Sequence, residues 1–144
     1  MQKKQHRQER SYGVVPLRKR DGAWELFLVQ HRAGHWSLPK GHEEKGEMPL
    51  GTAKRELFEE THLTIEQLLF PEPLFEHYTF THDNVLIHKT VGYFIAQVTG
   101  EEKLELDELK ASKWVPLKEA SSIVTFREMK AILSKVCTLL GDVS

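Results

Sequence analysis

The segment that decides the fold runs from Gly41 to Leu63 and reads GHEEKGEMPLGTAKRELFEETHL. Pro49 stands where a helix favours a proline in its first turn, and helical periodicity follows from Leu50 to Thr61. One side of this expected helix is apolar and carries Leu50, Ala53 and Leu57. Residues 32–48, which precede it, are polar and lack periodicity, so we expect a loop there.

Three carboxylates share the neighbouring side of the helix: Glu56, Glu59 and Glu60. Like charges at this spacing repel each other, and the helix dipole disfavours anions near the C-terminal end. Hard divalent cations prefer clustered oxygen ligands, and Mg²⁺ is favoured when phosphates complete its shell. A solvated acidic face, partly offset by Arg55 four residues before Glu59, is the alternative. Periodicity alone does not decide between them.

The rest of the chain predicts strands on both sides of this helix. Five β-strands are expected, over residues 11–18, 24–31, 75–80, 89–99 and 113–115. A last helix, capped by Ser122 or Thr125, has apolar residues at i, i+3 and i+4 spacing from Met129 to Leu140. Residues 1–10 are expected to be a flexible lead-in to one domain that covers residues 1–144. We therefore predict an α+β or α/β/α layered fold, in which helices flank a central mixed β-sheet.

Composition excludes several classes of protein. The 20 Lys and Arg residues against 21 Asp and Glu residues give a net charge of −1, which argues against binding of duplex nucleic acid. The single cysteine, Cys137, rules out an internal disulfide and a cysteine-based zinc site. No apolar run is long enough to span a membrane, and no secretory signal is present. We expect a cytoplasmic monomer whose partner is a small molecule.

The spacing from Gly41 onward resembles the signature of the Nudix hydrolases, Gly-x5-Glu-x7-Arg-Glu-U-x-Glu-Glu-x-Gly-U, where U is a bulky aliphatic residue. Eight of its nine specified positions match, including Gly41, Glu47 and the run from Arg55 to Glu60. The chain departs from it at His62, where the family has glycine in a left-handed helix cap. We expect histidine to adopt this conformation at a cost of about 1 kcal/mol and activity to survive. The resemblance implies a Nudix fold.

Two further stretches resemble one subfamily, the asymmetrical diadenosine tetraphosphate hydrolases. The run from His35 to His42, HWSLPKGH, is similar to its His-Trp-x-x-Pro-Lys-Gly-His lead-in. The stretch from Trp114 through Lys130 is similar to its C-terminal part. This resemblance implies hydrolysis of diadenosine tetraphosphate to ATP and AMP by attack of water at phosphorus.

The same resemblance implies a metal site and a set of catalytic residues. Four carboxylates would bind Mg²⁺, or Mn²⁺ in its place: Glu56, Glu59, Glu60 and Glu108. Catalysis would rest on Glu59, Glu60, Glu108 and Arg55. Glu60 is expected to bridge metals directly, and Glu47 to support the metal site or to orient Arg55. Glu108, six residues before Trp114, would act as base or ligand, although it could also be an ordinary surface carboxylate.

Phosphate binding is expected from two lysines and two histidines. Lys40 and Lys89 would contact phosphate oxygens as compact point charges. His35 and His42 would donate hydrogen bonds to phosphates, and a loop histidine without such a role is the alternative for His42.

The adenine needs an aromatic platform, because stacking is worth about 1–3 kcal/mol per base. The resemblance places Phe80 and Phe126 at the corresponding positions. Strand alternation puts Tyr78 on the same face as Phe80, so Tyr78 could share the platform. Core packing is the alternative for each of these aromatic residues.

Other readings of the same motif stay open. The substrate could be a nucleoside triphosphate, a diphosphoinositol polyphosphate or the 5′ end of an RNA, although the near-neutral charge disfavours RNA. A catalytically silent Nudix-like domain that senses a nucleotide would usually lack the motif carboxylates. This chain keeps all of them, which favours an enzyme.

Overall fold

The computed structural model describes residues 5–141 of the chain. In this range the elements are β1 (Gln5–Arg20), β2 (Ala23–His31), β3 (Trp36–Ser37), β4 (Lys40–His42), α1 (Pro49–Thr61), β5 (Thr64–Leu68), β6 (Leu74–His82), β7 (Val85–Thr99), β8 (Leu109–Pro116), α2 (Leu117–Ile123) and α3 (Arg127–Leu140). In the same range, none of the helices is long and apolar enough to cross a membrane.

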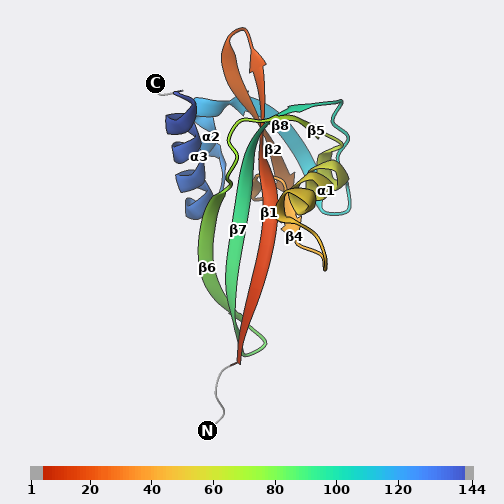
Figure 1. The fold of residues 1–144 in the computed structure, drawn as a ribbon, viewed down its shortest axis with the longest axis vertical. Coiled ribbons are helices and arrows are strands. Elements are labelled where there is room, and N and C mark those ends of the chain that lie inside the picture. Colours follow the sequence, from red (N-terminus) through yellow and green to blue (C-terminus); the bar gives the residue numbers. More distant parts are fainter. Residues whose placement is uncertain (1–4, 142–144) are drawn as a thin grey trace.

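The sheet is built around β1 and β7, which run parallel from Gln5 opposite Val85 to Leu17 opposite Gln97 (Figure 1). The other pairs are antiparallel: β2 and β4 with β1, β3 and β8 with β2, and β5 and β6 with β7. A parallel centre with antiparallel neighbours makes the sheet mixed, as the sequence predicts.

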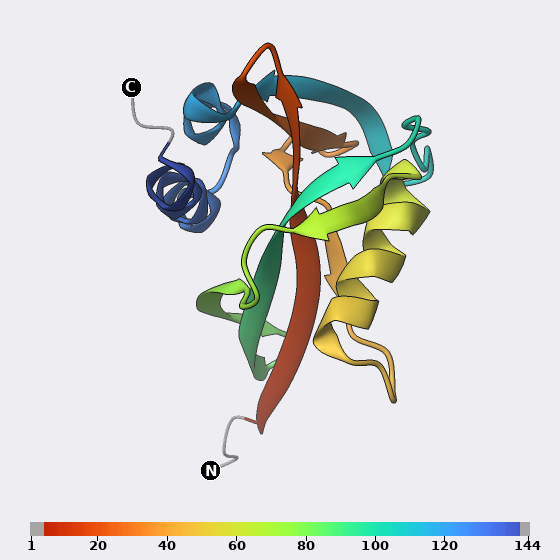
Figure 2. The same ribbon diagram turned by 45° about the horizontal axis from the view of Figure 1, so that its top comes forward.

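Helices cover the two faces of this sheet, with α1 on one side and α2 and α3 on the other (Figures 1 and 2). Alternation along β1 divides the core between them. Val14 packs in the cluster that contains Ala53 and Leu57 of α1, whereas Val15 packs in the cluster that contains Ile132 of α3. The predicted layered α+β fold is therefore confirmed.

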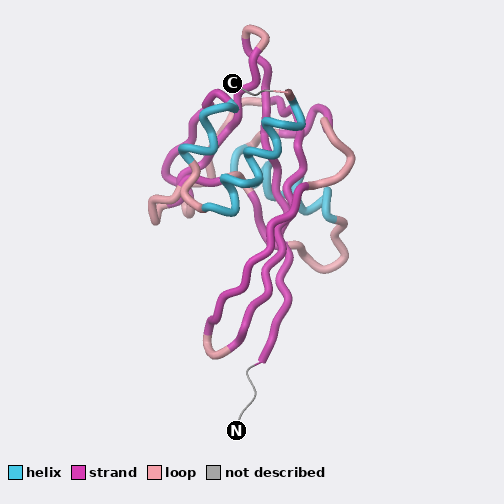
Figure 3. The backbone as a smooth tube through the Cα atoms, turned by 90° about the vertical axis from the view of Figure 1, so that its left-hand side faces the viewer, coloured by secondary structure: helices cyan, strands magenta, loops and turns pink. Residues whose placement is uncertain are grey.

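The first part of β1 corrects the expectation of a flexible lead-in. Residues 5–10 form a strand that pairs in parallel with residues 85–90 of β7. The cause is the length of the β6–β7 hairpin, which extends beyond the helices and offers β1 a long edge (Figure 3). Residues 1–4, also part of that expectation, lie outside the described residues.

Several short elements, inside and outside the predicted loop, also differ from expectation. The loop at 32–48 contains β3 and β4, which have two and three residues and are fixed by pairing with β2 and β1. The strand β5 and the seven-residue helix α2 were not expected. Such short elements depend on tertiary pairing more than on local periodicity.

The predicted cap of the last helix is wrong. The N-cap of α3 is Phe126, without a side-chain hydrogen bond. The Thr125 hydroxyl instead accepts a 2.9 Å hydrogen bond from the Trp36 N–H, and the Ser122 hydroxyl donates to the carbonyl of Glu119. Thr125 therefore links α3 to β3.

His62 ends α1 in the left-handed conformation that the motif position requires, with φ 64° and ψ 9°. Its N–H donates a 2.9 Å hydrogen bond to the carbonyl of Phe58, and its ring stacks on the Phe58 ring at 4.7 Å. The expected positive φ of this histidine is confirmed.

We predict that His62→Gly raises the free energy of unfolding by about 0.5–1 kcal/mol, because glycine adopts this backbone conformation without steric cost. His62→Val should lower the free energy of unfolding by at least about 1 kcal/mol, since a β-branched residue is strained at positive φ. Urea denaturation of both variants measures the difference. A destabilised glycine variant would mean that stacking on Phe58 outweighs the backbone strain.

Candidate active site

The acidic side of α1 is held by one guanidinium group. Arg55 Nε and Nη2 donate to the two carboxylate oxygens of Glu47 at 2.7 and 3.0 Å. Arg55 Nη1 donates to Glu56 at 2.9 Å and to Glu59 at 3.2 Å, and Nη2 also reaches the carbonyl of His42. Hydrogen bonding to Arg55 and to the Glu44 N–H lowers the pKa of Glu47 to about 2. The predicted orienting contact between Glu47 and Arg55 is present.

Gly41 lets β4 approach this helix closely. A Cβ atom at Gly41 would lie 2.0 Å from the carboxyl carbon of Glu56, so no other residue fits without moving that carboxylate. Gly41 pairs with Tyr12 of β1, which fixes it in the sheet beside α1. The glycine of the motif therefore positions a carboxylate.

Glu60 is buried, and Lys40 compensates its charge only in part. Its side chain lies at the inner side of α1, the residue is 8% exposed, and its Oε2 has no hydrogen-bond partner within residues 5–141. Burial raises the pKa of Glu60 to about 8; the charges of Glu56 and Glu108 add to this, and Lys40 opposes it. A buried carboxylate with one unpaired oxygen is costly, so the position calls for a cation.

Glu108 reaches the same cluster from the segment before β8. The charge of Glu108 contributes to the raised pKa values of both Glu56 and Glu60. Glu105 holds this segment, because its carboxylate accepts the Glu108 N–H at 3.2 Å and its own N–H donates to the carbonyl of Glu60. Glu108 thus faces the acidic cluster, as predicted, and its role as base or ligand stays a prediction.

The four carboxylates fit a hard divalent cation. Carboxylate oxygens are the donors that Mg²⁺ selects, and the unpaired Oε2 of Glu60 lacks the positive charge that such an ion supplies. Within the described residues, no three His, Cys, Asp or Glu side chains already form a ligand set. Glu56 and Glu59 are ion-paired with Arg55, which neutralises part of their charge.

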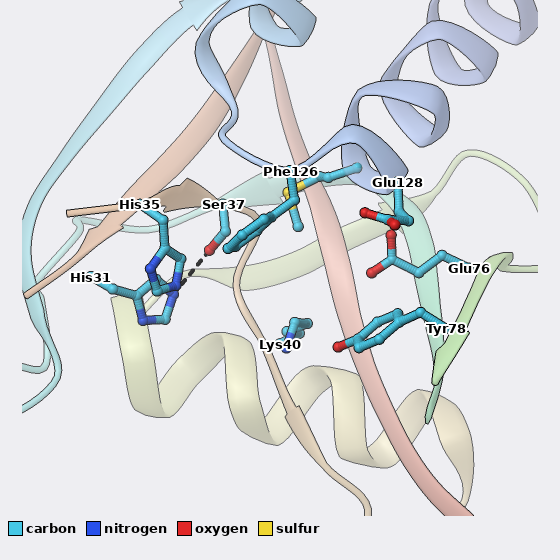
Figure 4. Close-up of a pocket in the computed structure, with 9 residues that line it drawn as sticks. His31, His35, Ser37, Lys40, Glu76, Tyr78, Phe126 and Glu128 are labelled. Carbon is cyan, nitrogen blue, oxygen red and sulfur yellow. Dashed lines mark hydrogen bonds between the residues drawn. The ribbon is translucent and has the colours of Figure 1, made fainter. Parts of the chain in front are cut away.

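A pocket of about 440 Å³ opens on the α3 side of the sheet (Figure 4). It is lined by His31, His35, Ser37, Lys40, Glu76, Tyr78, Phe126, Glu128 and Met129. Tyr78 of β6 and Phe126 before α3 lie on different sides of it (Figure 4). Phe126 is 51% exposed and Tyr78 half-buried, so their rings are accessible to a flat ligand.

Two stacked histidines form another wall of this pocket. The rings of His31 and His35 are 4.1 Å apart and nearly parallel, and the Phe126 ring lies 5.3 Å from His35. His31 Nε2 lies 2.9 Å from the Ser37 hydroxyl. Burial, with the positive charges of His35 and Lys40, lowers the pKa of His31 to about 4, so this imidazole is neutral near pH 7. His31 therefore supports His35 by ring stacking and by its backbone N–H, which donates a 2.9 Å hydrogen bond to the His35 carbonyl.

Lys40 connects the pocket with the acidic cluster. Its side chain lines the pocket, and its charge opposes the burial that raises the pKa values of Glu60 and Glu76. It also contributes to the lowered pKa of His35, after the larger effect of burial. The Lys40 ammonium group therefore acts on a carboxylate of the pocket and on a carboxylate of the acidic cluster.

Lys89 and His42 form a second basic group at the end of this surface. Lys89 is 6% exposed, and its Nζ lies 2.9 Å from His42 Nε2 and 3.8 Å from Glu9 Oε1. Lys89 pairs directly with Tyr78 in the β6–β7 register, which places it next to the aromatic pocket. His42 is thus fixed by a contact with another predicted substrate residue.

Phe80 does not line the pocket. It lies on the same face as Tyr78, as predicted, with ring centroids 6.1 Å apart, and is 41% exposed. Tyr78 takes the position beside the cavity instead. Because Phe80 and Phe126 are both exposed, neither is a core residue.

Sequence reasoning missed two acidic residues of the pocket, Glu76 and Glu128. Glu76 lies two residues before Tyr78 on the same face of β6, so strand alternation could have identified it. Glu128 lies in the first turn of α3, and only the fold brings it to the pocket.

The geometry agrees with the similarity of this chain to known proteins. A family model described as the NUDIX domain matches residues 7–136. The bis(5'-nucleosyl)-tetraphosphatase [asymmetrical] of Caenorhabditis elegans is 33% identical over 132 residues, which cover 90% of this chain and 94% of that protein. The RNA pyrophosphohydrolase of Bartonella henselae is 34% identical over 144 residues and covers 80% of both chains. A crystal structure of a C. elegans Ap4A hydrolase binary complex superimposes with a TM-score of 0.72 at 27% identity, covering 94% of this chain and 99% of that one.

We predict that Glu60→Gln removes a pH-dependent loss of stability from the metal-free protein. The folded-state pKa of about 8 lies above the ordinary 4.5, so Glu60 favours folding below pH 4.5 and loses this contribution as the pH rises through 8. The stability of Glu60→Gln relative to wild type should therefore increase by about 3 kcal/mol between pH 5.5 and 8. Urea unfolding with a chelator measures it, and the exposed Glu66→Gln is the control. An equal difference at both pH values would contradict the buried charge.

Gly41→Ala should displace the Glu56 carboxylate, lower the free energy of unfolding by about 1–3 kcal/mol and reduce turnover about 100-fold. Gly51→Ala is the matched control, since a Cβ there meets no atom within 4 Å and alanine favours the helix. Denaturation and hydrolysis assays on both variants measure the effects. Full activity in Gly41→Ala would show that the position of Glu56 is not critical.

Proposed function

The chain belongs to the Nudix family, as the match over residues 7–136 shows, and on that premise we propose that it hydrolyses diadenosine tetraphosphate asymmetrically to ATP and AMP. Nudix hydrolases generally act on nucleotide substrates and use divalent metal ions. The observation that carries the proposal is the place of Lys40, between the aromatic pocket and the acidic cluster. The asymmetrical tetraphosphatase of C. elegans, similar along nearly its whole length, supports this choice of substrate.

The pocket and the two basic groups would bind opposite parts of the substrate. One adenine stacks between Tyr78 and Phe126, which contributes about 1–3 kcal/mol. Its phosphate chain leaves the pocket past Lys40, whose ammonium group binds phosphate oxygens as a point charge. Lys89, with His42 beside it, supplies further positive charge on this surface. This arrangement orients a long phosphate chain.

The carboxylates would provide the chemistry at phosphorus. Glu56, Glu59, Glu60 and Glu108 would hold Mg²⁺, or Mn²⁺ in its place, and a bound ion of this kind neutralises phosphoryl charge and acidifies water. Glu108 is exposed and makes no contact with Arg55, so it is free to take the proton of the attacking water. Arg55 holds the carboxylates in position through its bonds to Glu47, Glu56 and Glu59.

An RNA substrate is the second candidate, because the similar Bartonella protein is an RNA pyrophosphohydrolase. A net charge of −1 gives little general attraction for a long polyanion. Nucleoside triphosphates and diphosphoinositol polyphosphates, which the same motif can serve, are further substrates to compare. The chain retains the four carboxylates, which a catalytically silent Nudix-like sensor would usually lack.

Product analysis tests the proposal. Purified protein is incubated with diadenosine tetraphosphate and Mg²⁺ in ¹⁸O-labelled water, and the products are separated by ion-exchange chromatography. We expect ATP and AMP in equal amounts, one of them labelled, and no turnover with a chelator. Glu60→Gln should reduce turnover at least about 100-fold, whereas the exposed Glu66→Gln keeps it.

Two ADP molecules would contradict the asymmetrical cleavage. Faster hydrolysis of a triphosphorylated RNA, ATP or a diphosphoinositol polyphosphate would contradict the proposed substrate. It would still agree with a metal-dependent hydrolase. Full turnover by Glu60→Gln would contradict the proposed metal site.

A further inference from the structure

An acidic segment lies beside the acidic cluster and needs contacts that keep it there. Residues 101–108 read EEKLELDE and carry five carboxylates against one lysine. Like charges at short range repel each other, so this segment and the carboxylates of α1 would tend to separate. The backbone nevertheless joins them, because the Glu105 N–H donates a 3.0 Å hydrogen bond to the carbonyl of Glu60. Glu108 lies in the same segment, and its position depends on how firmly the segment is held.

The turn that contains Glu108 is fixed at its two ends. Glu105 precedes it and is bonded to the last part of α1, whereas Leu109 follows it and is buried in the core on the α1 side of the sheet. The Leu109 N–H also donates to the carbonyl of Glu105 at 3.2 Å, which closes the turn. Residues 106–108 between these ends are exposed. Packing against the core therefore does not determine where the Glu108 carboxylate points.

Arg32 binds the middle of this turn from the end of β2. Its Nε donates a 2.7 Å hydrogen bond to the carbonyl of Leu106, and its Nη2 donates to the same oxygen. Its backbone N–H donates a 2.9 Å hydrogen bond to the carbonyl of Glu108. One residue therefore holds the turn on both sides of Asp107.

The chain around Arg32 is itself well fixed, because it forms the turn that carries the two histidines of the pocket wall. The His31 N–H donates to the carbonyl of His35 at 2.9 Å, and the Gly34 N–H donates to the carbonyl of His31 at 2.8 Å. The Gln30 side chain adds a 3.0 Å hydrogen bond to the carbonyl of Gly34. Arg32 thus joins the pocket wall to the turn that contains Glu108.

The pairing of β2 with β8 becomes irregular at the same place. The register shifts between Gln30 and His31, so that His31 pairs with Leu109. A β-bulge of this kind ends the regular ladder and changes the direction of the side chains that follow it. The turn before β8 consequently depends on side-chain hydrogen bonds, and Arg32 supplies them from the β2 side.

We propose that Arg32 is a positioning residue, which holds the turn 106–108 through its bonds to Leu106 and Glu108 and so directs the Glu108 carboxylate towards the acidic cluster. Two guanidinium donors on one carbonyl oxygen fix the turn more closely than a single ammonium group can. Arg32 differs in this from Arg55, whose side chain binds the carboxylates themselves. The inference rests on the proposed function, which gives Glu108 its role as base or ligand.

A double-mutant cycle with Glu108 tests the inference. Arg32→Gln should lower kcat about tenfold and change KM less than about threefold, because the misplaced group acts at phosphorus and not in the pocket. In a Glu108→Gln background the same substitution should lower kcat by less than about twofold, since Arg32 then has no carboxylate to position. Arg32→Lys should lose less than Arg32→Gln, because its ammonium group can still donate to the Leu106 carbonyl. The exposed Arg20→Gln removes the same charge elsewhere and should keep the wild-type kcat.

Amide hydrogen exchange of the metal-free protein gives a readout that does not depend on turnover. The N–H groups of Asp107, Glu108 and Leu109 are bonded to Glu105, so they report directly on the turn. They should exchange at least about fivefold faster in Arg32→Gln than in wild type, whereas the amides of α1 should not change. Unchanged exchange of these three amides in both Arg32→Gln and Arg32→Lys would overturn the inference.

The two proposals fail in different ways. If wild-type protein cleaves diadenosine tetraphosphate to ATP and AMP, and Arg32→Gln lowers kcat equally with and without the Glu108 carboxylate, positioning by Arg32 is overturned and the proposed function is kept. If wild-type protein cleaves a different nucleotide, the proposed substrate is wrong. The same cycle measured on that nucleotide, together with the exchange of the turn amides, then supports or overturns the role of Arg32.

Discussion

The Arg55 guanidinium joins parts of the molecule that like charges would otherwise separate. It binds Glu47 from the loop before α1, two carboxylates of α1 itself and the carbonyl of His42 at the end of β4. Its planar donors match several carboxylates at once, which a lysine could not do. The loop, the helix and the strand therefore keep fixed relative positions, and the acidic cluster can form next to the sheet.

Arg55 does not pair with one carboxylate of this cluster, that of Glu60. Glu60 faces inward, away from solvent, and nothing within residues 5–141 bonds to its Oε2. Its raised pKa means that the metal-free protein carries an unfavourable group at its centre. A cation bound at Glu60 would supply the positive charge that this carboxylate lacks. Cation binding would therefore stabilise the folded protein. The site is thus built at some expense of stability, as functional sites often are.

The helix and the grouping of its carboxylates could be predicted from the sequence because the determining residues are close together in the chain. The spacing from Gly41 to His62 gave the acidic cluster and the left-handed cap, both local properties. The strands β3 and β4, with two and three residues, carry too little periodicity to be recognised. The pocket joins β4, β6 and α3, so Glu128 could be assigned to it only after folding, and the hairpin length that orders residues 5–10 is equally non-local.

In the proposed function, the charges of the site form an alternating series, which would give the bound molecule one orientation. The carboxylates of Glu76 and Glu128 are followed by the ammonium of Lys40, and beyond it lie the carboxylates around Glu60. A base with amino groups, an anionic phosphate chain and a divalent cation are the complementary series in the same order. Reversing the ligand would place phosphate against carboxylate at one end, where repulsion is strong in a partly buried pocket. In the proposed function, one lysine between two acidic groups would therefore favour a phosphate-bearing ligand in a single orientation.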